Sequence, residues 1–155
     1  MSRHGIVIAG GGPTGLMLAC ELALCGVRRR VLEALPRPTG LSKALGFSGR
    51  AVDILEFRGI LDRFRAAAPH LGDIGRLVHF GGIPLDVGRV PGLVLPFVPV
   101  LQADTEAILG ARAAELGIEI ERGSEVVGIE PHDDHVAVTV AGGGGGRRGP
   151  ASGVG

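Results

Sequence analysis

Tryptophan and tyrosine are absent from this sequence, and its 155 residues include only five phenylalanines. Proteins that bind single-stranded nucleic acid stack the bases on aromatic side chains and attract the phosphates with an excess of positive charge. Here 16 basic residues are balanced by 16 acidic residues, so the formal net charge is zero. The composition therefore argues against nucleic acid, or an anionic membrane surface, as a partner.

Cysteine is nearly absent, since only Cys20 and Cys25 occur, and their spacing matches no metal-binding or redox motif. We expect both to be small buried apolar residues of a protein in a reducing compartment, the cytoplasm. No apolar run approaches the roughly 18 residues that a membrane span requires. We also expect no signal peptide, because the first residues have the pattern of a strand. The three arginines at 28–30 are expected to form a solvated strand edge.

Glycine, in contrast, is abundant, and its first cluster is the most informative part of the chain. An apolar run at residues 6–9 leads into Gly10, Gly12 and Gly15, which fit the pattern G-x-G-x-x-G. The first glycine allows a tight turn, the second lets phosphates approach the backbone, and the third lets a helix pack closely on the strand. The N–H groups and positive dipole at the helix start then supply an anion site.

The residues after this cluster strengthen that interpretation. Residues 16–25 contain no proline or glycine and predict a helix, with Gly26 at the position of a C-cap glycine. A second strand at 29–33 ends in Glu33, 23 positions after Gly10, where a carboxylate accepts hydrogen bonds from an adenosine ribose. The alternatives are a glycine-rich loop of another α/β protein and an ordinary acid at a strand end.

The rest of the chain predicts an α/β fold, in which a parallel sheet of Rossmann-like β-α-β type carries an antiparallel addition. Asp104 is placed to cap a helix that Gly117 ends. We expect a polar turn, and no metal site, where two histidines and two aspartates cluster at 131–135. The expected helices are 48–57, 60–68 and 104–116, the expected strands are 77–80, 83–87, 93–98 and 118–120, and the expected hairpin strands are 124–130 and 136–140.

Several sequence blocks together resemble one family. They are residues 10–16, residues 31–33, residues 49–50 leading into 55–59, and Gln102 followed by Thr105 and Glu106. With the segment 38–47, these blocks make the chain similar to the N-terminal part of the single-component FAD-dependent aromatic hydroxylases, in the branch that acts on polyketides and related antibiotics. The resemblance covers about residues 6–140. Asp104 departs from it, because this branch commonly carries a basic residue there.

The resemblance implies a set of cofactor-binding residues. Glu33 would bind the adenosine ribose of FAD, and Arg50 and Gln102 would contact the cofactor, with a surface arginine and a helix-capping amide as the alternatives for these two. Lys43 falls where the family often has a basic residue. No catalytic residue is assigned. The FAD pyrophosphate would lie against Gly10, Gly11, Gly12, Pro13, Thr14 and Gly15.

The resemblance also implies a reaction and a domain organisation. In such enzymes NAD(P)H reduces the flavin, which then uses O2 to hydroxylate an aromatic substrate. Residues 1–75 and 101–141 would form the FAD-binding domain, 76–100 a partial insertion of the substrate-domain sheet, and 142–155 a disordered or aberrant tail. Because the family continues into further strands, we expect an incomplete fold and no hydroxylation by this chain alone. The alternatives are a non-catalytic fragment that binds FAD or adenine nucleotides, and an NAD-binding module of a dehydrogenase.

Overall fold

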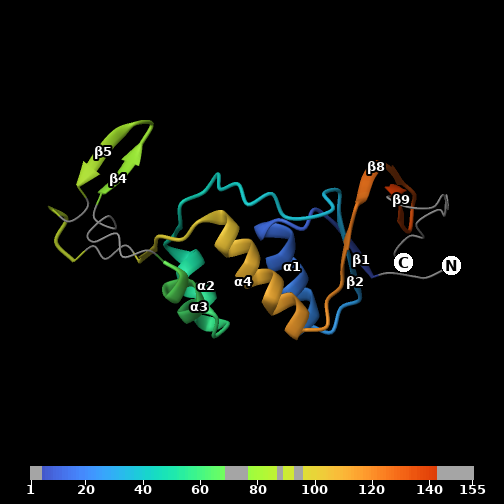
Figure 1. Ribbon diagram of the computed structural model, residues 1–155, viewed down its shortest axis with the longest axis horizontal. Coiled ribbons are helices and arrows are strands. Elements are labelled where there is room, and N and C mark those ends of the chain that lie inside the picture. Colours follow the sequence, from blue (N-terminus) through green and yellow to red (C-terminus); the bar gives the residue numbers. More distant parts are fainter. Residues whose placement is uncertain (1–4, 69–76, 87–88, 93–95, 143–155) are drawn as a thin grey trace. The chain divides into compact units, whose positions relative to one another are not determined.

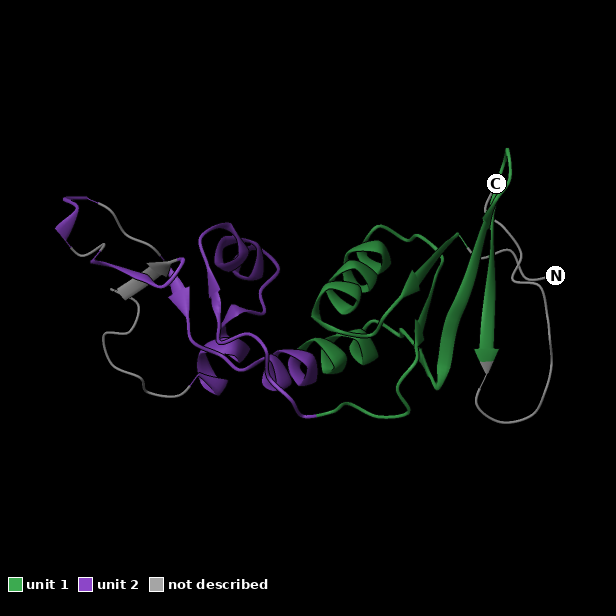
Figure 2. Ribbon diagram, turned by 90° about the horizontal axis from the view of Figure 1, so that it is seen from above, with its two compact units in different colours: residues 1–39, 109–155 green, residues 40–108 purple. Residues whose placement is uncertain are grey.

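The computed structural model describes residues 5–68, 77–86, 89–92 and 96–142 (Figure 1). The chain divides into two compact units (Figure 2), of which unit 1 comprises residues 1–39 and 109–155 and unit 2 comprises residues 40–108. Within the described ranges, no helix has both the length and the apolarity of a membrane span.

Unit 1 is built on a three-stranded parallel sheet. Its strands are β1 (Ile6–Ala9), β2 (Arg29–Glu33) and β7 (Ile120–Arg122), in the order β1-β2-β7. Helix α1 (Pro13–Leu24) connects β1 to β2. The predicted β-α-β unit with a parallel sheet is therefore confirmed, although β7 begins two residues later than the expected strand at 118–120.

Helix α1 buries a narrow apolar face. Ala19 is 0% exposed and Leu16 is 1% exposed, as expected if small and branched residues face the sheet. The helix begins at Pro13 and not at residue 16, because proline fits the first helical position, where its missing N–H would have no helical acceptor. Cys20 is buried as expected, but Cys25 caps the helix and is exposed, so the prediction of burial was wrong for Cys25.

The expectation of a solvated arginine edge was also wrong for Arg29 and Arg30, whereas Arg28 is exposed as expected. The Arg30 guanidinium donates two hydrogen bonds to the Glu121 carboxylate on β7, at 2.5 and 2.6 Å. These bonds raise the pKa of Arg30. Arg29 donates to the Leu116 carbonyl, at 3.3 Å, just beyond the last turn of a helix. The basic run thus ties β2 to its neighbours within unit 1.

The antiparallel addition of unit 1 is a hairpin of β8 (Ser124–Pro131) and β9 (Val136–Gly142), shown in orange and red in Figure 1. Its turn is closed by the His132 N–H, which donates to the His135 carbonyl at 2.8 Å. The two imidazole rings stack with centroids 4.4 Å apart, and His135 Nδ1 lies 2.6 Å from an Asp134 carboxylate oxygen. The predicted polar hairpin turn is confirmed.

Unit 2 contains helices α2 (Arg50–Phe57) and α3 (Leu61–Ala67) and two short antiparallel pairs of strands. Phe64 of α3 is 0% exposed and makes an edge-to-face contact with the Phe47 ring, at 5.6 Å between centroids. The strand pairs are β3 (Phe47–Ser48) with β6 (Phe97–Val98), and β4 (Leu77–Phe80) with β5 (Ile83–Asp86).

Helix α4 (Gln102–Glu115) starts in unit 2 and ends in unit 1. It begins two residues before the expected start, so Asp104 lies inside its first turn and the prediction that Asp104 caps the helix was wrong. Helix α2 begins at Arg50 because the two residues that precede Gly49 pair with β6. The expected strand residues at 87 and 93–95, and the tail from residue 143, lie outside the described residues.

Candidate functional site

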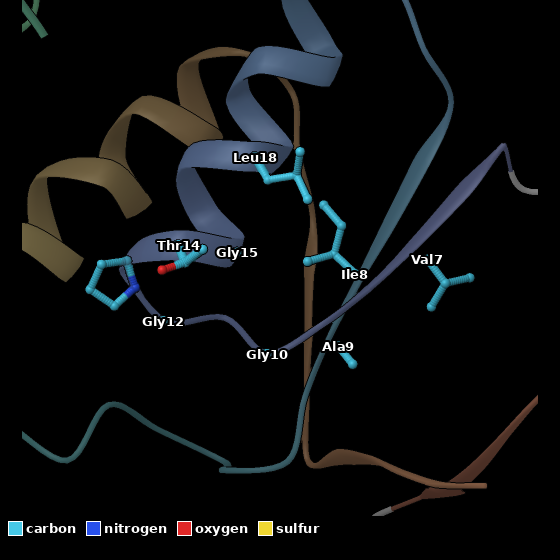
Figure 3. Close-up of a pocket in the computed structure, with 9 residues that line it drawn as sticks. Val7, Ile8, Ala9, Gly10, Gly12, Thr14, Gly15 and Leu18 are labelled. Atoms are coloured by element: carbon cyan, nitrogen blue, oxygen red, sulfur yellow. The ribbon is translucent and has the colours of Figure 1, made fainter. Parts of the chain in front are cut away.

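The candidate site is the turn that leads from β1 into α1 (Figure 3). Gly10 has φ +111°, a backbone conformation that other L-residues rarely adopt, and its N–H donates to the Leu32 carbonyl at 2.7 Å. A Cβ on Gly15 would lie 2.0 Å from the Gly10 carbonyl oxygen. The folded chain by itself therefore requires glycine at both positions.

Gly12 differs from these two glycines. Its φ of −79° and ψ of −175° are open to any residue, and a Cβ built there would meet no heavy atom within 4 Å. Neither backbone strain nor packing therefore requires glycine at position 12. The open space at Gly12 is instead what a bound group would need in order to approach the backbone closely.

The start of α1 also carries unused hydrogen-bond donors. The first backbone hydrogen bond of the helix runs from the Leu16 N–H to the Gly12 carbonyl, at 2.9 Å, and Pro13 has no N–H. The N–H groups of Gly12, Thr14 and Gly15 thus precede the helical hydrogen bonds. No side chain caps this end and no acidic residue lies in its first turn. The helix dipole and these donors together favour an anion.

A pocket of about 480 Å³ opens beside this turn (Figure 3). Its walls are the end of β1 and the first turns of α1, and Thr14 contributes an exposed hydroxyl group. The pocket is lined by Val7, Ile8, Ala9, Gly10, Gly12, Pro13, Thr14, Gly15 and Leu18.

Glu33 lies at the end of β2 and is hydrogen-bonded to this turn. Its Oε2 accepts a hydrogen bond from the Gly11 N–H at 2.6 Å, and its Oε1 accepts one from the Leu35 N–H at 2.8 Å. An ionised carboxylate offers about four acceptor positions, so these bonds leave room for further donors such as sugar hydroxyls. Unit 1 therefore brings the predicted glycine-rich turn and the predicted acid together.

Unit 2 brings together two more of the predicted residues. The Lys43 N–H donates to the Gln102 side-chain oxygen at 3.2 Å, across 59 residues of sequence. The Gln102 amide nitrogen donates to the Glu106 carboxylate at 2.8 Å. Arg50 is the exposed first residue of α2, and within the described part of unit 2 no hydrogen bond or ion pair joins it to Lys43 or Gln102.

Two contacts, one within each unit, are not predicted from the sequence. Nothing in the spacing of Gly11 and Glu33 indicates that they bond directly. Glu106 has a detectable signal, because it lies four residues after Gln102, a spacing that puts two side chains on one helix face. Among the described residues, no group of three or more His, Cys, Asp or Glu side chains is arranged to hold a metal ion.

Comparison with known proteins identifies the kind of domain. A family model described as an FAD binding domain matches residues 3–150. A relative named as a 12-dehydrotetracycline 5-monooxygenase/anhydrotetracycline 6-monooxygenase, from Streptomyces rimosus, is 47% identical in an alignment 146 residues long that covers 90% of this chain and 27% of that protein. A dialkyldecalin synthase from Streptomyces rugosporus is 38% identical over 138 residues, which are 89% of this chain and 29% of that protein.

A solved structure agrees with these sequence matches. OxyS anhydrotetracycline hydroxylase from Streptomyces rimosus superposes with a TM-score of 0.77 and 44% identity, over 97% of this chain and 29% of that one. The chain thus spans a little over a quarter of the length of each of these relatives.

Proposed function

The chain belongs to the FAD binding domain family, and on that premise we propose that it is the FAD-binding portion of an NAD(P)H-dependent monooxygenase that hydroxylates an aromatic, polyketide-like substrate. The proposal extends the activity of longer relatives to a chain that spans a little over a quarter of their length. It includes a cytoplasmic location, where NAD(P)H is available.

One observation carries this proposal: the open position at Gly12 lies in the same turn that the Glu33 carboxylate holds. A Cβ at Gly12 would meet nothing within 4 Å, and Glu33 Oε2 bonds the neighbouring Gly11 N–H at 2.6 Å. A dinucleotide presents an anionic pyrophosphate next to a ribose with hydroxyl donors. The turn supplies N–H donors and space for the first group, and Glu33 supplies acceptor positions for the second.

In this proposal each predicted residue has a role in binding or orientation. Within the turn from Gly10 to Gly15, the N–H groups of Gly12, Thr14 and Gly15 hold the pyrophosphate, and the Thr14 hydroxyl offers an additional donor. Glu33 accepts hydrogen bonds from the adenosine ribose. Lys43, Arg50 and Gln102 are assigned to the remaining part of the cofactor, which the family resemblance supports.

The chemistry of the reaction belongs to the cofactor. When bound, FAD accepts electrons from NAD(P)H and uses O2 to hydroxylate the substrate. The residues of this chain bind the cofactor and fix its orientation, and we assign none of them a proton-transfer step. Residues 1–75 and 101–141 as the FAD-binding domain, and 76–100 as part of a substrate-domain sheet, remain part of the proposal.

A second candidate function is FAD binding without hydroxylation. It is favoured by the similarity to a dialkyldecalin synthase, whose name describes no hydroxylation and which matches nearly the same share of the chain as the tetracycline monooxygenase. A third candidate, an NAD-binding module of a dehydrogenase, would use the same glycine-rich turn and the same acid. The three differ in the ligand retained and in whether NAD(P)H is consumed.

The test is to purify the chain, add FAD, remove free ligand by gel filtration and measure the flavin absorbance. We expect about one FAD per chain and negligible NAD(P)H oxidation, because the chain spans only a little over a quarter of the length of the relatives. A parallel titration with NAD⁺ identifies a dehydrogenase module. Retention of NAD⁺ without retention of FAD would overturn the proposal, and substrate-dependent NAD(P)H oxidation would overturn the expected inactivity of the chain alone.

A further inference from the structure

A loop in unit 2 is held against the first turn of α4 by three hydrogen bonds. The Ala103 N–H donates to the Ser42 hydroxyl oxygen, the Lys43 N–H donates to the Gln102 side-chain oxygen, and the Gln102 N–H donates to the Ala44 carbonyl, each at 3.2 Å. Residues 42–44, which we call the 42–44 segment, are exposed. Their order therefore depends on these bonds more than on packing.

The orientation of the Gln102 side-chain amide in this network depends on another residue, Glu106. A primary amide can be turned over, which exchanges its oxygen and its nitrogen. The Lys43 N–H can only donate, so it requires the amide oxygen. An ionised Glu106 carboxylate can only accept, and it accepts from the Gln102 amide nitrogen at 2.8 Å. The two neighbours therefore select the same one of the two amide orientations.

We propose that Glu106 is a positioning residue of the cofactor site, because it fixes the orientation of the Gln102 amide and, through it, the 42–44 segment. This inference rests on the proposed function, in which Gln102 and Lys43 lie at the FAD site. One N–H of the Gln102 amide remains after the bond to Glu106, and the orientation of the amide sets its direction. Glu106 itself does not contact the cofactor in this account.

The position of Glu106 on α4 suits this role. It lies one helical turn after Gln102, where side chains at i and i+4 face each other. The preceding residue, Thr105, is 2% exposed and its hydroxyl donates to the Leu101 carbonyl at 3.1 Å. The first turn of α4 is therefore anchored in unit 2, so a change of the Glu106 side chain acts on Gln102 without loosening the helix.

The experiment compares two substitutions of Glu106 in the full chain. Glu106→Leu removes the acceptor and keeps most of the volume, whereas Glu106→Gln keeps one acceptor oxygen. The matched control is Glu115→Leu, which removes a carboxylate from the other end of α4, where it pairs with Arg112 at 3.0 Å. Amide hydrogen exchange of the 42–44 segment, measured by NMR without FAD, reports its order directly. FAD affinity is measured by titration of flavin fluorescence.

We expect Glu106→Leu to speed amide exchange at Lys43 by about fivefold to tenfold and to weaken FAD binding by a similar factor, the effect of one hydrogen bond. Glu106→Gln should restore most of both, and Glu115→Leu should change neither. Unchanged exchange in Glu106→Leu would overturn the inference. Faster exchange with unchanged FAD affinity would also overturn it, because Glu106 would then order the loop without affecting the cofactor.

The proposed function and the role of Glu106 can be contradicted separately. The wild-type FAD titration tests the proposed function before any variant is compared. If wild type does not bind FAD, the proposed function is contradicted and Glu106 has no role at an FAD site. If wild type binds FAD, the difference between Glu106→Leu and Glu106→Gln decides the inference by itself.

Discussion

Replacing Gly12 by alanine separates what the ligand requires of this glycine from what the fold requires. The new Cβ would have no heavy atom within 4 Å, and the φ of −79° is favourable for alanine. Alanine is a poorer N-cap than glycine by about 1 kcal/mol or less. It also restricts the unfolded chain, which stabilises the fold by about 0.4–1 kcal/mol. The free energy of unfolding should therefore stay within about 1 kcal/mol of wild type.

FAD binding should respond much more strongly to the same change. The methyl group would occupy the space through which the pyrophosphate approaches the Gly12 N–H, so at least one hydrogen bond to a charged group would be lost. Such a bond contributes about 1.5–3 kcal/mol. We therefore expect FAD to bind about 10- to 100-fold more weakly.

The assay pairs thermal unfolding, followed by circular dichroism, with titration of flavin fluorescence. Gly110→Ala is the matched control, because a Cβ on Gly110 in α4 would also meet no atom within 4 Å. This control should be more stable than wild type by up to about 1 kcal/mol, since alanine is the better helix former, and it should bind FAD as wild type does. A stably folded Gly12→Ala chain with wild-type FAD affinity would refute the assignment of the pyrophosphate to this turn.

Four further predictions concern the same chain. Glu33→Gln replaces a carboxylate oxygen by an amide nitrogen, so without FAD the free energy of unfolding should fall by about 1–2 kcal/mol; unchanged stability in urea titrations would contradict the role of Glu33 in the turn. Phe64→Ala removes a ring that is 0% exposed and should cost about 3–5 kcal/mol in urea unfolding; a loss below about 1 kcal/mol would contradict its core position. A thiol reagent should label Cys25 well before Cys20, because burial raises the pKa of Cys20 while Cys25 is exposed; mass spectrometry of the singly labelled chain decides this order. Since the Cys20 pKa is higher in the folded chain than in the unfolded chain, stability should also fall as pH rises above the unfolded pKa of that thiol.

The sequence predicts well those helices, strands and turns whose formation depends on residues close to each other in the sequence. The turn residues 10–15 and the apolar runs on either side specify β1, α1 and β2, because strand, tight turn and helix each have a local signal. The polar residues at 131–135 specify the hairpin of β8 and β9 in the same way. The proline-free and glycine-free run 16–25 predicts a start of α1 that is three residues too late, because proline is favourable at the first helical position.

The elements that sequence misses depend on pairing across long stretches of chain. Strands β3 and β6 contain two residues each, and they pair Phe47 with Val98 and Ser48 with Phe97, which are 51 and 49 residues apart. Strand β6 lies within the expected strand at 93–98, whereas β3 has no local pattern, and the pairing of the two moves the start of α2 to Arg50. The hydrogen bond from Lys43 to Gln102 also joins distant parts of the chain. The family resemblance points to each of the two residues, but it does not predict that they are in contact. Resemblance to a family identifies residues, whereas only the fold gives their contacts.

Gly11 shows how closely the two halves of the proposed site depend on each other. It stands at a position that G-x-G-x-x-G leaves unspecified, yet a Cβ there would lie 3.2 Å from the Glu33 Cβ and 3.3 Å from both the Glu33 Oε2 and the Ile120 Cγ2. A Cβ at this position would require Glu33 or Ile120 to move by a few tenths of an ångström. The absence of a Cβ therefore leaves the Glu33 carboxylate the room to accept from the Gly11 N–H at 2.6 Å. Because one short bond joins the turn to the acid, the shape of the anion-binding turn and the position of the acid are set together, before any ligand binds. A dinucleotide would then meet donors and acceptors already in place, and little of its binding free energy would be spent on ordering them.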